Sequence, residues 1–193
     1  MKFTKYCLSV CALIFILGGC TTRKSEIIIT NDCSAVLQID FAGNPLTLTP
    51  AQSYHQSFFL DELLFFQETK KLSIAYDGFI YLASAKQNIT LCPNETKHLV
   101  LHNNRAGIEI NNLSEVPIAE IRLRPIESSK WSENYLQQPT VAENFSFSVQ
   151  AEPVDLKLID TTERVFVLND TIDLQVGSSA VLFFDSFSLL YAE

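Results

Sequence analysis

The sequence has few of the residues that usually perform catalysis or bind metal ions. It contains three histidines: His55 stands alone, and His98 and His102 lie four residues apart in a predicted strand, where about 13 Å would separate them. It also lacks the Gly-x-Ser-x-Gly, His-Glu-x-x-His and glycine-rich phosphate-loop motifs. We therefore expect no catalytic residues, no metal and no cofactor.

Positive charge is also scarce. The chain has 14 Lys and Arg against 22 Asp and Glu, a formal net charge of −8, and its densest basic features are only Lys70/Lys71 and Arg122/Arg124. Nucleic acids select for clustered Lys and Arg, so we expect no nucleic-acid partner. Hydrophobic residues make up 47% of the sequence, which excludes disorder as a description of the whole chain.

An apolar run long enough to cross a bilayer is missing too. Lys2 and Lys5 precede an apolar stretch from Cys7 to Leu17, about eleven residues, whereas a membrane-spanning helix needs about 20. This pattern is typical of a cleaved signal peptide.

The stretch ends in Leu17-Gly18-Gly19-Cys20, which resembles the lipobox of bacterial lipoproteins. The resemblance implies that residues 1–19 are removed, that Cys20 is lipidated, and that the membrane is a partner through this lipid. Thr21 after the cysteine favours the outer membrane over the inner one. Removing 19 of the 193 residues, with Lys2 and Lys5 among them, leaves 174 residues with a net charge of −10.

Of the five cysteines, Cys7 and Cys11 leave with the signal peptide and Cys20 carries lipid, so that Cys33 and Cys92 remain. In an oxidising exported setting these two could form a disulfide closing a loop of about 60 residues. The alternative is two free buried thiols. No further cysteine or suitably spaced histidine completes a metal site with them.

The rest of the chain predicts an all-β fold. Short segments rich in β-branched and aromatic residues recur about every 8–12 residues, separated by Asn, Asp, Gly, Pro or Ser. Two points stay open: whether 46–49 and 53–59 are one strand or two, and whether 58–71 is a helix or a strand, since Phe59, Leu63 and Phe66 have helical spacing. The predicted strands are Glu26–Thr30, Val36–Phe41, Leu72–Tyr76, Phe79–Ala83, Ile89–Cys92 and Leu99–His102.

An internal repeat is indicated when the chain is aligned with itself at an offset of about 81 to 84 residues. Ile27–Asn31 then matches Ile108–Asn112, and Lys97–Leu101 matches Ala180–Phe184. We predict a lipidated tether at 20–25 and two tandem immunoglobulin-like antiparallel β-sandwich units at 26–104 and 107–186, with the polar stretch 103–107 as their boundary.

The second predicted unit contains the only tryptophan, in an insert after Arg122-Leu123-Arg124-Pro125. With Trp131 and Asn134, residues 107–185 resemble a small exported bacterial module of uncharacterised function, in which "Ser-Pro-x-x-Ser-x-x-Trp-Gly-x-Asp-x-Leu" follows an "Ile-x-Asn-Asn" strand. Arg124 stands in place of the serine before the proline, and Ser132 in place of the glycine after the tryptophan. These departures weaken a ligand site, and we expect Trp131 to close one end of the sandwich core.

The remaining candidates point to binding. The segment 58–66 contains more large apolar residues than one face of a strand or helix can bury. We therefore predict contacts with a protein partner at Phe58, Phe59, Leu63, Phe65 and Phe66, together with Trp131. The leading hypothesis is a non-enzymatic, membrane-anchored interaction or envelope-structural module. The alternative is a small-ligand or calcium-binding lipoprotein that uses the Trp131 insert or the acidic end of the second unit, at Asp160, Glu163, Asp170 and Asp173, although a solvated acidic edge explains these residues as well.

Overall fold

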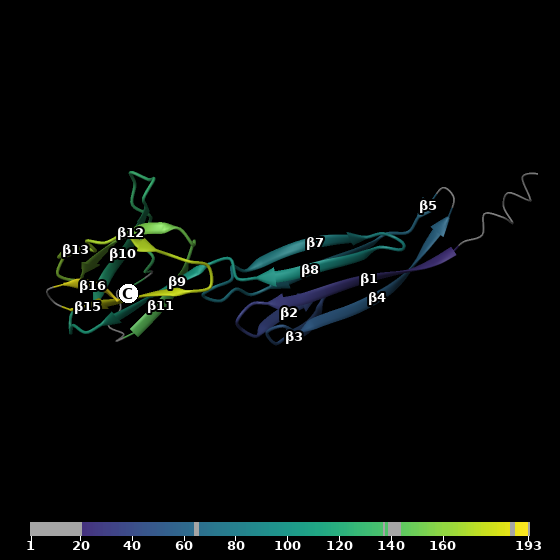
Figure 1. Ribbon diagram of the computed structural model, residues 1–193, viewed down its shortest axis with the longest axis horizontal. Coiled ribbons are helices and arrows are strands. Elements are labelled where there is room, and N and C mark those ends of the chain that lie inside the picture. The colour runs from purple at the N-terminus through teal and green to yellow at the C-terminus, as the bar shows by residue number, and fades with distance from the viewer. Residues whose placement is uncertain (1–20, 64–65, 137, 139–143, 186–187, 193) are drawn as a thin grey trace, which may run out of the picture. The chain divides into compact units, whose positions relative to one another are not determined.

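The computed structural model describes residues 21–192 except 64–65, 137, 139–143 and 186–187, and the described residues form strands and no helix (Figure 1). No helix that could span a membrane is therefore present in these ranges. The all-β prediction is confirmed. The strands are β1 Thr21–Asp32, β2 Leu37–Phe41, β3 Asn44–Leu48, β4 Ser53–Leu63, β5 Phe66–Gln67, β6 Lys70–Tyr76, β7 Ala85–Leu91, β8 Thr96–His102, β9 Ala106–Asn112, β10 Ile118–Pro125, β11 Asn144–Val149, β12 Pro153–Asp160, β13 Val165–Val167, β14 Ile172–Asp173, β15 Ser179–Phe184 and β16 Leu189–Ala192.

The first of two compact units contains β1 to β8 in two four-stranded sheets, with strand orders β5-β4-β1-β8 and β3-β2-β6-β7. The alternation of buried and exposed residues expected for a half-buried strand is clear in β2, where Leu37, Ile39 and Phe41 are buried. In the opposite sheet, Ile27 and Ile29 of β1 are buried. The rings of Phe41 and Tyr54 meet edge to face across the sandwich, with their centroids 5.6 Å apart. The regions 46–49 and 53–59 thus belong to two strands, β3 and β4.

β1 and β4 form a ribbon that continues past the core of this unit. Their pairing runs from Thr30↔Ser53 to Thr21↔Glu62, and residues 21–24 are exposed. Residues 21–25, which we predicted to be a tether, are therefore strand. In the segment 58–71, residues 58–63, 66–67 and 70–71 are strand and none of the described residues is helical, because the backbone groups of β4, β5 and β6 pair with neighbouring strands.

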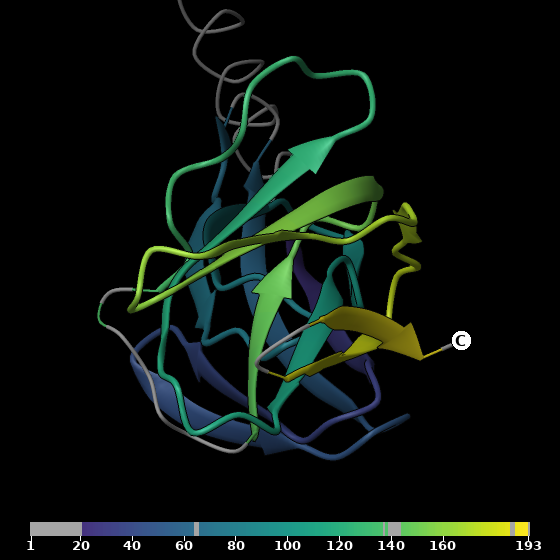
Figure 2. The ribbon, with the colours of Figure 1, turned by 90° about the vertical axis from the view of Figure 1, so that its left-hand side faces the viewer.

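The second unit contains β9 to β16, again in two sheets: β10-β12-β13 with β14 also paired to β12, and β11-β9-β15-β16 (Figure 2). Leu156 and Leu158 of β12 pack with Ile108 and Ile110 of β9 in one apolar core. The rings of Phe166 and Phe184 meet edge to face at 4.9 Å, which joins the two layers. Each unit is thus a two-layer β-sandwich, as the sequence predicted.

The division of the chain differs from the predicted one, because residues 78–84 belong to the second unit although they lie between β6 and β7. The predicted strand Phe79–Ala83 is wrong: these residues form a tight turn, in which Phe79 and Leu82 exchange backbone hydrogen bonds of 2.9 and 3.0 Å. Leu82 is 2% exposed, and the Tyr81 hydroxyl lies 2.9 Å from Ser179 Oγ. At Gly107 an added Cβ would lie 2.7 Å from Ile80 Cγ2, so the close approach of this turn to β9 requires glycine.

One parallel strand pair is present in each unit. β9 and β15 pair in parallel from Gly107↔Ser179 to Asn112↔Phe184. β1 and β8 are neighbours in their sheet; the Glu26 amide donates to the Glu95 carbonyl at 2.9 Å, and seven residues further on Cys33 Sγ lies 3.1 Å from the Leu101 carbonyl. Both contacts advance in the same direction along the two strands, so this pair is parallel too. In each unit the first strand thus pairs with a late strand in parallel.

The two units also share a buried asparagine at the end of the first strand. Asn31 and Asn112 are 0% and 5% exposed. Asn31 Nδ2 donates to the Ala35 carbonyl and its Oδ1 accepts from the Cys33 amide; Asn112 makes the same two bonds, to Val116 and from Ser114. The same turn thus follows β1 and β9, at positions 81 residues apart.

Candidate interaction surfaces

The insert of the second unit covers the free edge of β10. The Ser132 amide donates to the Leu123 carbonyl and the Tyr135 amide to the Ile121 carbonyl, at 2.8 and 2.9 Å. In the other direction, Ser132 Oγ accepts from the Leu123 amide and Asn134 Oδ1 from the Ile121 amide. The loop that leaves β10 therefore turns back and runs along it (Figure 2). Ser132 and Asn134 give this segment a structural function that the sequence analysis did not foresee.

We expected Trp131 to close one end of the sandwich core, but it does not. It lies on the outer face of the β10–β12 sheet, against the cations of Arg124 and Lys157, each 4.8 Å from the ring centroid. Arg124 Nη2 also donates to Asp155 Oδ2 at 2.6 Å. This bond holds the pKa of the Asp155 carboxyl below its ordinary value, and a hydrogen bond from Thr171 adds to the effect while burial opposes it. Trp131 remains half-buried, and its function as a partner contact remains a prediction.

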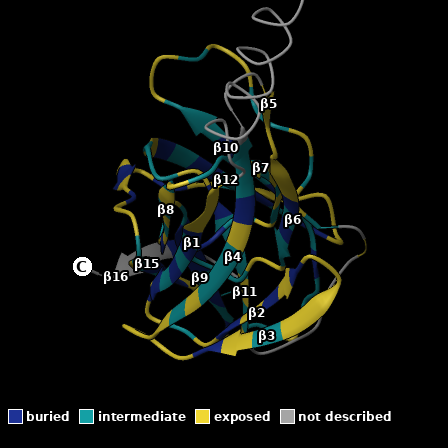
Figure 3. Cartoon of the chain, turned by 90° about the vertical axis from the view of Figure 1, so that its right-hand side faces the viewer, coloured by how far each residue is buried: buried dark blue, intermediate teal, exposed yellow. Residues whose placement is uncertain are grey.

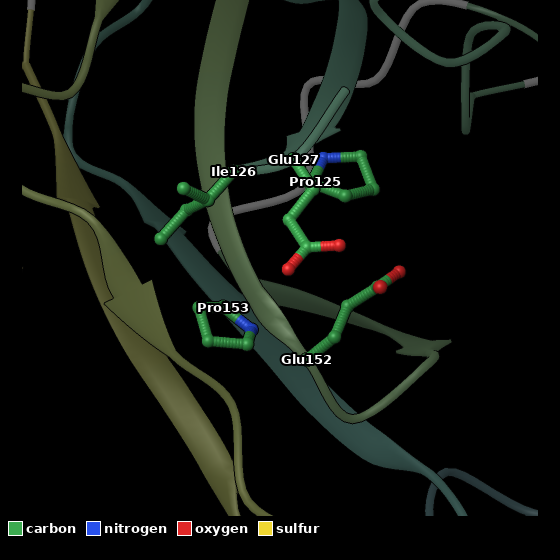
Figure 4. A pocket seen from close by; sticks show the side chains of 5 residues that line it. All are labelled: Pro125, Ile126, Glu127, Glu152 and Pro153. Carbon is green, nitrogen blue, oxygen red and sulfur yellow. The ribbon is translucent and has the colours of Figure 1, made fainter.

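Two shallow depressions lie next to the insert. One, of about 390 Å³, is lined by Pro125, Ile126, Glu127, Glu152 and Pro153, and the carboxylates of Glu127 and Glu152 face the same space (Figure 4). The other, of about 170 Å³, includes Arg105 and Tyr135. Burial raises the pKa of the Tyr135 hydroxyl, Arg105 opposes this, and Glu152 adds to it. These groups could hydrogen-bond a polar ligand, but neither depression contains a nucleophile paired with a base.

The acidic residues of the second unit do not assemble into a metal site. Among the described residues no group of three or more His, Cys, Asp or Glu could hold a metal ion. Asp160 is instead committed to its own turn: Oδ1 accepts from the Thr162 amide, the Thr162 hydroxyl and the Arg164 amide, and Oδ2 accepts from Arg164 Nε at 2.7 Å. Burial acts to raise the pKa of Asp160, but these hydrogen bonds outweigh it and hold the pKa below the ordinary value.

Cys33 and Cys92 are both free thiols, but only Cys33 is buried as the second alternative expected, whereas Cys92 is half-buried. They lie far apart along β1: Ser25 Oγ donates to the Cys92 carbonyl at 2.8 Å, whereas Cys33 follows the end of β1, eight residues and about 26 Å beyond Ser25. A disulfide requires Cα atoms within about 7 Å. Burial raises the pKa of the Cys33 thiol, with a smaller contribution from Asp32.

The predicted apolar contact segment is partly on the surface. Phe59 and Phe66 are 71% and 62% exposed, the highest exposed fractions among the described aromatic side chains, while Phe58 is half-buried. Phe65 and the side chain of Leu63 lie outside the described residues. In Figure 3 exposed parts of β4 are separated by covered ones; its exposed residues Ser53, His55 and Phe59 share one face of the strand, as expected where the other face lies on a core.

No family model matches this chain, and no curated protein sequence matches it. Several solved structures show distant similarity. The Bacillus anthracis TIE protein is 12% identical with a TM-score of 0.31 over 88% of this chain, which spans 34% of that structure. The tip fimbrial protein Mfa3 from Porphyromonas gingivalis is 7% identical with a TM-score of 0.36, covering 89% of this chain and 99% of the other. The shaft pilin SpaA from Lactobacillus rhamnosus GG is 9% identical with a TM-score of 0.28, covering 86% and 99%. Similarities this low assign neither a fold nor a function to this chain.

Proposed function

We propose that this chain is a lipid-anchored, non-enzymatic interaction module of the bacterial cell envelope, attached to the outer membrane through Cys20. The observation that carries the proposal is the Leu17-Gly18-Gly19-Cys20 sequence, which is followed at once by the first strand of a β-sandwich. The fold supports it in that both units are β-sandwiches with exposed apolar side chains, and the second also has two depressions on its surface.

The alternative, a ligand- or calcium-binding lipoprotein, has less support. Cations already lie against the ring of Trp131, and both carboxylate oxygens of Asp160 already accept hydrogen bonds. Trp131 and Asp160, two of the residues named for this function, are thus engaged within their own unit.

Metabolic labelling with an alkyne-bearing palmitate analogue tests the anchor. The wild-type chain should be labelled and should sediment with membranes, whereas Cys20→Ala should be neither labelled nor membrane-bound. Cys11→Ala is the matched control and should behave as wild type, because Cys11 lies in the part of the signal peptide that is removed. Persistent labelling of Cys20→Ala would refute lipidation at this position.

Protease treatment of intact cells then determines which side of the membrane the module faces. Loss of the chain while a periplasmic control survives would mean surface display, and survival would mean a periplasm-facing module. Catalytic turnover that depends on His55, His98 or His102 would contradict the non-enzymatic part of the proposal.

A further inference from the structure

The end of the β1–β4 ribbon lies directly beside the proposed lipid attachment point. Thr21 is paired with Glu62, and Cys20 precedes Thr21 by one Cα–Cα step of about 3.8 Å. β5 continues the ribbon, with Glu62 opposite Gln67 and Leu63 opposite Phe66. Phe66 is therefore one residue beyond the Thr21↔Glu62 pair along the ribbon. In Figure 1, β5 and the N-terminal end of β1 lie at the same end of the first unit, on either side of β4.

The ribbon is held together at this end, so the position of β5 relative to Thr21 is fixed. Thr22 Oγ1 donates to Asp61 Oδ1 at 3.0 Å, and Arg23 Nε donates to Glu62 Oε2 at 3.2 Å. The Glu68 amide donates to the Asp61 carbonyl at 2.9 Å, which holds β5 against β4. Thr21, the residue directly after Cys20, is already paired in the ribbon.

Phe66 lies on the surface of the unit and not in its core. Its side chain is 62% exposed, at the same end of the ribbon as the exposed residues 21–24. Aromatic side chains are enriched where a protein meets the headgroup layer of a membrane, which is about 6 Å thick on each side of the hydrocarbon core. A side chain one strand step beyond Thr21, the residue that follows the proposed lipidated cysteine, is close enough to the anchor to reach this layer.

Resting on the proposed lipidation of Cys20, we propose that Phe66 at the tip of the β1–β4–β5 ribbon inserts into the membrane interface and fixes the orientation of the first unit on the bilayer. Phe59 provides the contrast. It is 71% exposed and pairs with Lys24, three residues and about 10 Å along the ribbon from Thr21. Phe59 therefore stands above the headgroup layer.

Fluorescence quenching in vesicles tests this proposal. Trp131→Phe removes the single native tryptophan, and Phe66→Trp or Phe59→Trp is then added to the full acylated chain. Both positions are exposed, so both variants should unfold at the parent temperature. Each is reconstituted in vesicles of phosphatidylethanolamine and phosphatidylglycerol whose acyl chains are brominated near the headgroup.

Phe66→Trp should lose most of its emission to the brominated lipid and shift to shorter wavelength, while Phe59→Trp should match its emission in unbrominated vesicles. Equal quenching of the two would mean that the ribbon lies flat, and no quenching of Phe66→Trp would mean that the tip faces water or another protein; either result overturns the proposal. Mass spectrometry of the N-terminal peptide separates this from failure of the anchor, since a chain that is not acylated at Cys20 refutes the proposed function itself.

Discussion

The two units have the same pairing scheme around their central strands but protect the edge of one sheet in different ways. In the first unit β3 pairs with β2 along its whole length, from Leu37↔Leu48 to Phe41↔Asn44. In the second unit no strand of the described residues occupies the equivalent place beside β10, and the side chains of Ser132 and Asn134 take over the pairing of the edge amides. An unprotected sheet edge invites pairing with other chains. The comparison teaches that edge protection can be exchanged while the central strands stay the same.

The units also differ in their dependence on the rest of the chain. The second unit takes residues 78–84 from between two strands of the first, whereas the first takes nothing from the region after Leu101. The chain therefore passes between the units three times, at 77/78, 84/85 and 101/102. We expect the second unit to require the first half of the sequence in order to fold.

The largest effect is expected from Leu82→Asp, which breaks this dependence. Leu82 is 2% exposed, and an unpaired carboxylate there should cost about 4 kcal/mol of stability. Although residue 82 lies in the first half of the sequence, the second unit should become protease-sensitive while the first survives, as mass spectrometry of a limited digest would show. Val36→Asp, at a 53% exposed site, is the control. Preferential digestion of the first unit would contradict the assignment of residues 78–84.

The next effect compares the two buried asparagines. Asn31→Ala should cost about 3 kcal/mol and Asn112→Ala about 2 kcal/mol, because both leave buried backbone groups unpaired. The loss is larger at Asn31, since its Nδ2 also donates to the Leu48 carbonyl at 2.9 Å. Urea unfolding followed by a probe in each unit would measure both. A negligible loss of unfolding free energy in both variants would show that the shared turn is not a source of stability.

Acid should weaken the second unit through Asp160. Its pKa is lowered in the fold, so the stability that the carboxylate contributes is complete above the ordinary aspartate value of about 4 and is lost as the pH falls through the lower folded value. Asp160→Asn should destabilise the second unit by about 2 kcal/mol at neutral pH and flatten its unfolding curve below about pH 4. The stability of this variant should still depend partly on pH, because the pKa of Asp155 is also lowered in the fold. An unchanged pH profile would refute this explanation.

The smallest effects concern the two kinds of edge protection. Ser132→Ala should cost about 1 kcal/mol, because the Leu123 amide loses its acceptor. Thr47→Ala on β3 is the matched change in the first unit; it removes a surface bond to Gln38 and should cost less than about 0.5 kcal/mol, since β3 pairs through its backbone. Thermal unfolding of the two variants would compare them, and a larger loss at Thr47 would reverse the interpretation.

Much of the fold could be predicted from the alternation of apolar residues. Ile27 and Ile29, or Leu72 and Ile74, mark strands with one face on a core, and the structure has strands there. The segment 58–71 stayed ambiguous because Phe59, Leu63 and Phe66 fit two geometries. They have helical spacing, but they also fit a hairpin, in which Phe59 and Leu63 share a strand face and Phe66 pairs with Leu63.

The parts that could not be predicted depend on contacts between distant residues. The stretch from Phe79 to Ala83 has strand composition, yet a turn that packs against Ser179 prevails. The function of Ser132 and Asn134 was hidden because each bonds to backbone groups that any residue supplies. Trp131 was expected to close one end of the core, because a lone tryptophan in a turn-rich insert usually does so. Two cations on the outer sheet face stabilise it there instead.

The parallel pairing of β1 with β8 bears on how the first unit responds to mechanical force. The chain enters this unit at the start of β1 and leaves it at the end of β8. Because the two strands are parallel neighbours, these two points lie at opposite ends of the strand pair. Tension applied between Thr21 and His102 would then slide the two strands past each other, so that their hydrogen bonds share the load and break together instead of opening one by one like a zip. β9 and β15 are also parallel, but in the second unit β16 then returns antiparallel to β15, so its chain ends are not placed in this way. The first unit is thus the one whose architecture resists extension between its two ends.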